Sequence, residues 1–420
     1  MTKKYVCIMC VLLTAVLTAA ALFGCGANSP KDDTYGKNDD ANAPETYDVL
    51  QSVQKVAAEV RSSSLSGLLG KVTVDGKLQG DTAALLPTDN TQPSKALAEQ
   101  ALLLCSDTDK GTIADYVVRA GFATDSVKQF GYDKPADEVS HTAAFTTATQ
   151  ATTYNGESRT LMLVSVRGSV GTEWYSNLDF APSRNADTQF AENFLLAATD
   201  IYLTLCNEVK EMTQTPLFLV CGHSRGGAVA NLLTVLLNEK YGNSNVFGYT
   251  FATPNTVKGT LNGVYDGNLF NYVYDCDIVC RMPFAEWGFS RLGTDVVLTN
   301  GSKDNQARNE AKSLATIATD CAADIDEYYT ARWSLTEEGR SVKGITSFEL
   351  FTAFVAAALS DGQAGIGNID SSSLKSTTAK SHYAPLFVEI LKFADNPLKA
   401  IAVATRHMPA NYQQLIEGLK

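Results

Sequence analysis

Residues 216–227, PLFLVCGHSRGG, hold a short apolar run that leads into a glycine-rich turn around one serine. The run 216–221 has the length and composition of a buried β-strand, and residues 225–241 have the apolar spacing of an amphipathic helix. The turn between them, 222–226, fits the pattern G-x-S-x-G, which is typical of a sharp strand–turn–helix connection with an exposed serine. Ser224 would then lie at the helix N-terminus, where backbone N–H groups favour negative charge. The alternative is a turn in which Ser224 only caps the helix.

Segments of two kinds alternate around this turn. Longer segments with a helical spacing of apolar residues lie at 189–212 and 225–241. Alternation of strands and helices predicts a mainly parallel sheet with helices on both faces, which is an α/β fold. The short, β-rich apolar runs that predict the strands lie at residues 159–167, 216–221, 246–252 and 269–274.

Length and composition limit the class of protein. The chain has 420 residues, of which 45% are hydrophobic and 19% are charged, so it can bury a sizeable core and is neither disordered nor collagen-like. This length predicts two domains, or one large domain with an insertion. With 34 Lys and Arg against 46 Asp and Glu, the net charge is −12. Because phosphate contacts need clustered basic residues, we expect no nucleic-acid partner.

The N-terminal residues are typical of an export signal. Lys3 and Lys4 precede an apolar run at residues 6–23, and this arrangement predicts a secretory signal rather than part of the fold. The run ends in residues 22–25, LFGC, which resemble the lipobox of bacterial lipoproteins. The resemblance implies cleavage before Cys25, lipidation of Cys25 and anchoring at the extracytoplasmic face of the cell membrane. The alternative is an uncleaved membrane helix, because eighteen apolar residues just reach spanning length.

The cysteines that follow the export signal do not predict a metal site. Their even number permits disulfides in an exported protein but does not demand them. Cys276 and Cys280 on one strand would lie about 13 Å apart, which is too far for a bond, and no pattern of His or Cys completes a zinc site around them. We therefore expect ordinary buried thiols. The six residues are Cys105, Cys206, Cys221, Cys276, Cys280 and Cys321.

The order of several motifs resembles the class 3 lipases, which are α/β-hydrolases related to secreted fungal triacylglycerol lipases. Residues 166–169, VRGS, resemble the oxyanion segment of that family, and residues 222–227 resemble its nucleophile segment. Residues 251–254, FATP, and 277–283, DIVCRMP, resemble the segments that follow the next two strands, the second of which holds the catalytic acid. The resemblance covers about residues 94–283 and a short C-terminal piece. It implies an α/β-hydrolase fold and ester hydrolysis by a serine nucleophile.

A serine nucleophile in this fold is followed along the chain by an acid and then by a histidine. The chain has four histidines. His141 precedes the nucleophile, and His223 is fixed beside it and is expected to point to the other side of the turn. His407 begins the segment HMPANY, which resembles the terminal His-x4-Tyr segment of the family, so we expect His407 to be the base. His382, in a polar stretch, is the alternative.

Two acids follow the predicted strand 269–274. Side chains alternate along a strand, so Asp275 and Asp277 are expected on one face. Asp277 begins the segment that resembles the acid loop, and the resemblance implies that it is the catalytic acid. Asp275 is the alternative.

These assignments define a triad of Ser224, His407 and Asp277. His407 would take the proton of Ser224 during attack on an ester carbonyl, while Asp277 would hold the imidazole in the required tautomer. The oxyanion would accept hydrogen bonds from the backbone N–H groups of Arg225 and Ser169. We expect neither a metal nor an organic cofactor, because this chemistry requires none.

The predicted organisation has five parts, and helices are expected at residues 305–329 and 346–359. The parts are a signal peptide at 1–24, a flexible tether at 25–45, a hydrolase core at 46–285, an inserted helical cap at 286–400, and a C-terminal segment of the core at 401–420 that holds the base.

The predicted function is an extracytoplasmic serine ester hydrolase, a lipase that cleaves acylglycerol esters. Its expected partners are a lipid or small ester substrate and, through Cys25, the membrane; no oligomeric state is predicted. One alternative keeps the mechanism and changes the substrate to phospholipids or carbohydrate-linked acyl esters. The other is a non-catalytic surface lipoprotein that uses the fold for binding.

Overall fold

The computed structural model describes residues 78, 80–133, 142–169, 190–259, 267–320 and 406–419. Apart from Asp320, these residues belong to one of two compact units, which consists of Gly70–Thr319 and Ala402–Lys420. The predicted signal peptide, lipobox, tether and helix 346–359, together with His141, His382 and Cys321, lie outside the described residues. They therefore stay predictions.

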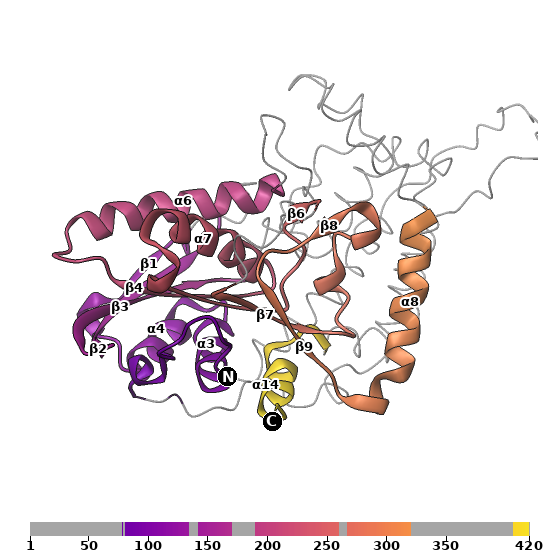
Figure 1. The fold of residues 1–420 in the computed structure, drawn as a ribbon, viewed down its shortest axis with the longest axis horizontal. Helices are drawn as coiled ribbons and strands as arrows, with labels where there is room; N and C mark the ends of the chain where they lie inside the picture. Colours follow the sequence, from indigo (N-terminus) through magenta and orange to yellow (C-terminus); the bar gives the residue numbers. More distant parts are fainter. Residues whose placement is uncertain are drawn as a thin grey trace, which may run out of the picture. The chain divides into compact units, whose positions relative to one another are not determined.

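A seven-stranded sheet forms the centre of this unit, in the order β1-β2-β3-β4-β5-β7-β9 (Figure 1). Strands β3, β4, β5, β7 and β9 run parallel, while β1 and β2 extend one edge in antiparallel pairing. A separate antiparallel pair joins β6 (Val257–Lys258) to β8 (Phe289–Ser290). The strands of the main sheet are β1 (Lys128–Phe130), β2 (Phe145–Tyr154), β3 (Glu157–Val166), β4 (Leu217–His223), β5 (Val246–Phe251), β7 (Leu269–Tyr274) and β9 (Thr294–Leu298).

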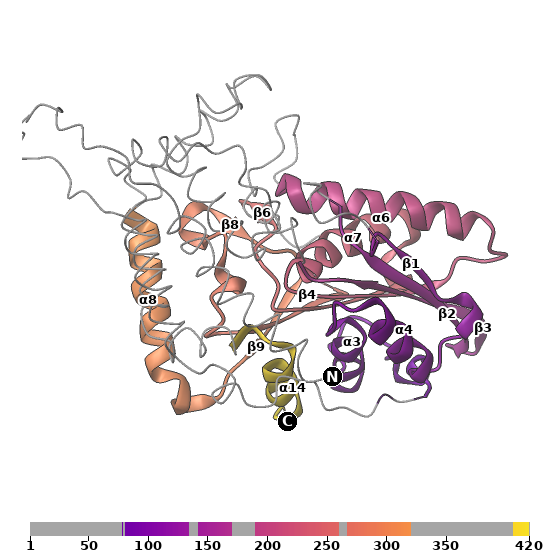
Figure 2. The ribbon, with the colours of Figure 1, turned by 180° about the vertical axis from the view of Figure 1, so that it is seen from behind.

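The middle strands are hydrophobic because helices cover both faces of the sheet. Every residue of β4, β5 and β7 is buried, as expected for parallel strands with helices on each side. Figures 1 and 2 show α6 and α7 on one face and α3, α4 and α14 on the other. The helices are α3 (Lys95–Cys105), α4 (Lys110–Arg119), α6 (Glu192–Lys210), α7 (Arg225–Tyr241), α8 (Asn305–Asp320) and α14 (Pro409–Glu417).

The register of the parallel strands brings their carboxyl ends together. Val166, the last residue of β3, lies opposite Gly222 in β4, and His223 lies opposite Phe251, the last residue of β5. The connections that follow these strands therefore meet at one edge of the sheet, which is where ligands bind in open α/β sheets.

The C-terminal helix α14 packs against the core although it is distant in sequence. Tyr412 and Ile416 are fully buried among residues of the core. Lys95, at the start of α3, donates hydrogen bonds of 2.7 Å to the backbone oxygens of both Glu417 and Leu419. An ammonium group at this position also stabilises the negative end of the helix dipole.

The predicted α/β-hydrolase fold is confirmed, with one change to its extent. Strands form at all four predicted runs, and α7 has the predicted bounds. The sheet continues past residue 285, where we predicted the end of the core, because β9 pairs with β7. This strand is short and mostly exposed, so it lacks the apolar run by which the other strands are predicted. Helix α8 begins at residue 305 as predicted, and residues 321–329 lie outside the described residues.

Candidate active site

Ser224 lies in the sharp turn between β4 and α7. Its backbone angles, φ 60° and ψ −128°, are unfavourable for any residue other than glycine. The turn is fixed by a hydrogen bond of 2.9 Å from the Ser224 N–H to the carbonyl of Phe251. A Cβ atom on Gly222 would lie 2.1 Å from the carbonyl oxygen of Gly226, and one on Gly226 would lie 2.3 Å from that of Val166. Only glycine fits at both positions, so the sequence pattern follows from the packing.

The structure brings Ser224, His407 and Asp277 into one hydrogen-bonded chain. His407 Nε2 lies 2.8 Å from Ser224 Oγ, and His407 Nδ1 lies 2.8 Å from Asp277 Oδ2. The carboxylate can only accept, so Nδ1 holds the proton and Nε2 is left to accept that of the serine. The side chain of Asp277 is completely buried, whereas that of His407 is 7% exposed.

Asp277 is buried as a carboxylate because several groups donate to it. Its Oδ1 accepts from the Val279 N–H at 2.9 Å, and its Oδ2 accepts from the Tyr412 hydroxyl at 2.8 Å. Burial favours the neutral acid, but the proximity of His407 and the hydrogen bonds from His407, Tyr412 and Val279 outweigh it and lower the pKa of Asp277. Asp277 thus stays charged at neutral pH.

Tyr412 contributes to the site, although only the resemblance to a His-x4-Tyr segment pointed to it. Its hydroxyl donates to Asp277, accepts from the Tyr274 N–H at 3.2 Å and lies 3.1 Å from Cys280 Sγ. Burial, followed by the nearby charge of Asp277, raises the pKa values of Tyr412 and Cys280 well above their usual range. Both groups therefore stay protonated and able to donate.

His223 lies alongside His407, not on the other side of the turn as we expected. The two rings are 5.0 Å apart, and His223 Nε2 lies 2.8 Å from the carbonyl oxygen of His407, to which it must donate. Burial, with a smaller contribution from His407, lowers the pKa of His223 to about 3. A neutral His223 therefore supports the backbone of His407.

Of the predicted oxyanion donors, Arg225 adjoins Ser224 in the chain, and Gly168, which precedes Ser169, lies near it. Arg225 follows Ser224 directly as the first residue of α7. Its buried side chain lies 5.7 Å from the ring centre of Phe194 and donates to the Thr142 carbonyl at 3.4 Å. The segment that ends in Ser169 also lies against the turn, because a Cβ atom on Gly168 would be 4.0 Å from Ser224 Cβ.

Asp275, the alternative acid, forms an ion pair with a residue of α8 instead. Strand β7 ends at Tyr274, and a turn follows in which the Asp277 N–H donates to the Tyr274 carbonyl at 3.0 Å. The two acids are therefore not on one strand face, which corrects our expectation. Arg308 Nε lies 2.6 Å from Asp275 Oδ2. Within the described part of the chain, Asp277 is the one acid that forms an ion pair with His407.

Asp275, Cys276 and Asp304 have ligand atoms within 4.8 Å of one another. Arg308 already supplies a positive charge there, at 2.6 Å from Asp275 and 3.8 Å from Asp304. Burial, followed by the neighbouring Asp275, raises the pKa of Cys276 to about 12, so its thiol stays protonated. A protonated thiol is a poor metal ligand, and the group is best described as an ion-pair cluster.

The described cysteines all have free thiols, as predicted for Cys276 and Cys280. Both of these lie after β7 and not on a shared strand. The five residues are Cys105, Cys206, Cys221, Cys276 and Cys280.

Comparison with known proteins finds a family match for part of the chain. Residues 163–287 match the family model Lipase (class 3), a range that includes Ser224 and Asp277 and is less than a third of the chain. No curated protein sequence matches the chain significantly.

Several solved lipase structures are similar to part of the chain. A fungal lipase in complex with an inhibitor is 21% identical, over 50% of this chain and 82% of that one, with a TM-score of 0.38. The triacylglyceride lipase of Rhizomucor miehei is 20% identical, over 50% and 81%, with a TM-score of 0.36. A lipase of Rhizopus microsporus var. chinensis is 16% identical, over 54% and 83%, with a TM-score of 0.33.

The sheet topology, the strained serine and the triad define the class of protein as a serine hydrolase with the α/β-hydrolase fold. Together with the family match, they identify the chain as a serine ester hydrolase that resembles class 3 lipases over residues 163–287.

Tyr412→Phe tests the contribution of the hydroxyl to the site. Loss of one hydrogen bond to a charged group should lower kcat about tenfold and the free energy of unfolding by about 1–3 kcal/mol. The matched control is Tyr249→Phe, because the buried Tyr249 also uses its hydroxyl to accept a backbone hydrogen bond, from the Ser94 N–H at 3.0 Å. This control should lower stability and leave kcat unchanged. Equal kcat values for both variants would contradict the assignment.

His223→Gln tests the neutral state of His223. An unfolded histidine binds a proton near pH 6.5, whereas the buried one does so only near pH 3. The stability linked to His223 is thus complete above pH 6.5 and decreases as the pH falls, by at most about 1.4 kcal/mol per pH unit. Urea unfolding between pH 7 and 4 should give a shallower pH dependence for the variant. Parallel curves would show that the pKa of His223 is the same in the folded and unfolded states and would contradict its lowered value.

Proposed function

We propose that this chain is an extracytoplasmic lipase that hydrolyses acylglycerol esters through an acyl-enzyme on Ser224. The observation on which the proposal rests is the continuous chain from Ser224 Oγ through His407 to Asp277, with both contacts at 2.8 Å. A protein that only binds a ligand has no physical need for these three hydrogen-bonded side chains, since a strained serine and a buried carboxylate both cost stability.

The proposed reaction begins with attack of Ser224 Oγ on the ester carbonyl while His407 Nε2 takes the serine proton. Asp277 stabilises the imidazolium that forms, and the backbone N–H groups of Arg225 and Ser169 donate to the oxyanion. His407 then returns the proton to the departing alcohol, which leaves an acyl-serine. Water, deprotonated by His407, hydrolyses this ester in the second half of the cycle. Each oxyanion donor contributes on the order of 3 kcal/mol.

The match to class 3 lipases supports lipid acyl esters as the substrate class. Phospholipids and carbohydrate-linked acyl esters are alternatives, because they contain the same reacting carbonyl and the same mechanism would cleave them.

The proposed location rests on residues 1–25, in which a basic start and an apolar run precede Cys25. We propose that Cys25 is lipidated and anchors the enzyme outside the cytoplasm. Within the described part of the chain, no helix combines the length and apolar character needed to cross a bilayer.

Ser224→Ala should abolish labelling by a fluorophosphonate probe and lower ester hydrolysis by several orders of magnitude. The variant should fold normally, because the serine hydroxyl contributes little packing and both residues have the same Cβ atom. His407→Ala should have a similar effect on turnover, whereas His382→Ala, at the alternative base, should retain activity. Hydrolysis of p-nitrophenyl esters of increasing chain length gives the rates and the acyl preference. Near wild-type turnover by Ser224→Ala would exclude the proposed mechanism.

Cys25→Ser should release the protein from the membrane fraction without changing its activity on soluble esters. The reason is that a thioether-linked lipid can form on cysteine but not on serine. Fractionation of cells that express either form, followed by esterase assays, makes the comparison. Continued membrane association of Cys25→Ser would instead support an uncleaved anchor at residues 6–23.

A further inference from the structure

We propose that Arg291 is a positioning residue that fixes the loop bearing Asp277 against the connection that follows β5. The inference rests on the proposed function, because it assigns a role in holding the triad together. Arg291 lies directly after β8, and its side chain is 13% exposed.

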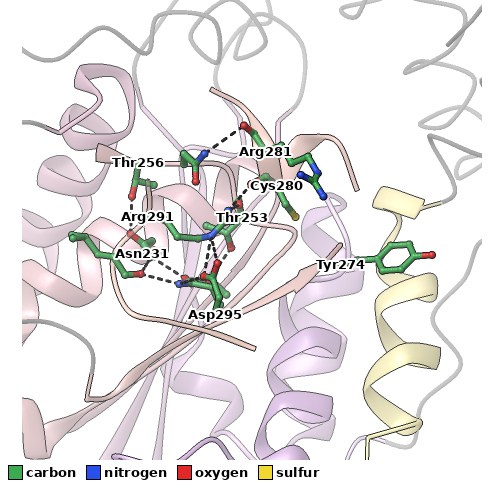
Figure 3. Close-up of polar contacts among 12 residues, drawn as sticks. Asn231, Thr253, Thr256, Tyr274, Cys280, Arg281, Arg291 and Asp295 are labelled. Atoms are coloured by element: carbon green, nitrogen blue, oxygen red, sulfur yellow. Dashed lines mark hydrogen bonds and ion pairs between the residues drawn. The ribbon is translucent and has the colours of Figure 1, made fainter. Parts of the chain in front are cut away.

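One nitrogen of Arg291 joins two loops of the active site. Its Nη1 donates to the carbonyl of Thr253, which follows β5, and at 2.7 Å to the carbonyl of Cys280. These two carbonyls converge on one point, where they would repel each other without the guanidinium between them. Figure 3 shows Arg291 between Thr253, Cys280 and Asp295.

Each of the joined loops is linked to one member of the triad. The Thr253 connection follows Phe251, whose carbonyl accepts the Ser224 N–H at 2.9 Å. Cys280 lies three residues after Asp277, and its Sγ contacts Asp277 Oδ2 at 3.5 Å. Arg291 therefore helps to set the separation between Ser224 and Asp277. It does so through the backbone carbonyls of Thr253 and Cys280 and not through the side chains of Ser224 and Asp277.

The orientation of Arg291 is fixed by a polar network that runs from the exposed Asp295 into the buried part of the sheet. Its Nε donates to both oxygens of Asp295, at 2.9 and 3.0 Å. Asp295 Oδ1 also accepts from Asn271 Nδ2 at 3.1 Å, and Asn271 Oδ1 accepts from Asn231 and from Thr250 at 2.9 and 2.7 Å. The network includes side chains from β9, β7, α7 and β5, and such connected networks favour one arrangement.

Lysine cannot replace arginine in this geometry. The guanidinium presents five donors in a rigid fork, which allows it to contact Asp295 and both carbonyls at once, whereas an ammonium group is a point donor on a flexible stem. Arg291→Lys thus retains the charge and removes the bridge. A small shift of the Asp277 loop would weaken the support of the His407 imidazolium, and a displacement of about 1 Å can cost about a hundredfold in rate.

Arg159→Lys is a matched control. Arg159 also bridges two loops, since its Nη2 donates to the Thr215 carbonyl at 3.1 Å and to Asn245 Oδ1 at 2.8 Å. Thr215 precedes β4 and Asn245 precedes β5, so this bridge lies at the amino ends of the strands, opposite the active site.

The experiment measures kcat and KM of the full-length variants on a p-nitrophenyl ester, with the number of active sites titrated by a fluorophosphonate probe. Arg291→Lys should lower kcat per titrated site about ten- to a hundredfold, with KM changed by less than about twofold. Arg159→Lys should lower the melting temperature and leave kcat per site unchanged. An unchanged kcat per site in Arg291→Lys, with a lower melting temperature, would overturn the proposal.

Asp295→Asn is a second variant that tests the role of Arg291 if Arg291→Lys does not fold. The amide weakens the contact that orients the guanidinium and so loosens both carbonyl bridges, and kcat per site should therefore fall in the same direction by a smaller factor. No change in kcat per site would overturn the proposal.

The proposed function is tested separately, because a wild-type enzyme that the probe fails to label refutes the serine mechanism itself. A labelled wild type with unaffected variants refutes only the role of Arg291.

Discussion

The arrangement of the active site depends on one buried carboxylate, Asp277. A charge without solvent is costly unless hydrogen bonds replace the lost hydration. Here the donors come from separate parts of the chain: the turn after β7 supplies the Val279 N–H and Cys280, and the C-terminal segment supplies His407 and Tyr412. Because these groups must converge on Asp277, the same requirement that stabilises the charge also orients His407, the proposed base.

The base reaches the site through docking of residues 406–419. Ile416 and Tyr412 are buried in the core, Lys95 binds the end of α14, and His223 donates to the backbone of His407. The segment thus combines hydrophobic contacts, which supply most of its stabilisation, with polar contacts that fix its register. A shift of α14 along its axis would separate His407 from Ser224 and Tyr412 from Asp277 together, so the polar contacts make the docking specific.

Local sequence patterns predicted the parts of the fold that depend on local physics. The glycines around Ser224 and the apolar runs of β4, β5 and β7 follow from steric and burial requirements that a short segment already shows. Strand β2 was not predicted, because its sequence, FTTATQATTY, has polar residues where one end is exposed. The roles of Asp275 and His223 were also missed, since each depends on a partner, Arg308 or the His407 carbonyl, that only tertiary structure brings near.

The polar residues inside the sheet are best explained by the geometry of the site. Thr250 and Asn271 lie fully buried in β5 and β7, where apolar side chains of similar size would give comparable or greater stability. Their hydrogen bonds lead through Asp295 to Arg291 and on to the carbonyls of two catalytic loops. A packed apolar core would fix the strands but would leave these carbonyls without a common donor. The network therefore transmits the rigidity of the sheet to the loops. It adds to the hydrogen bonds that Asn255, after β5, donates to the carbonyls of Met282 and Pro283 in the acid loop.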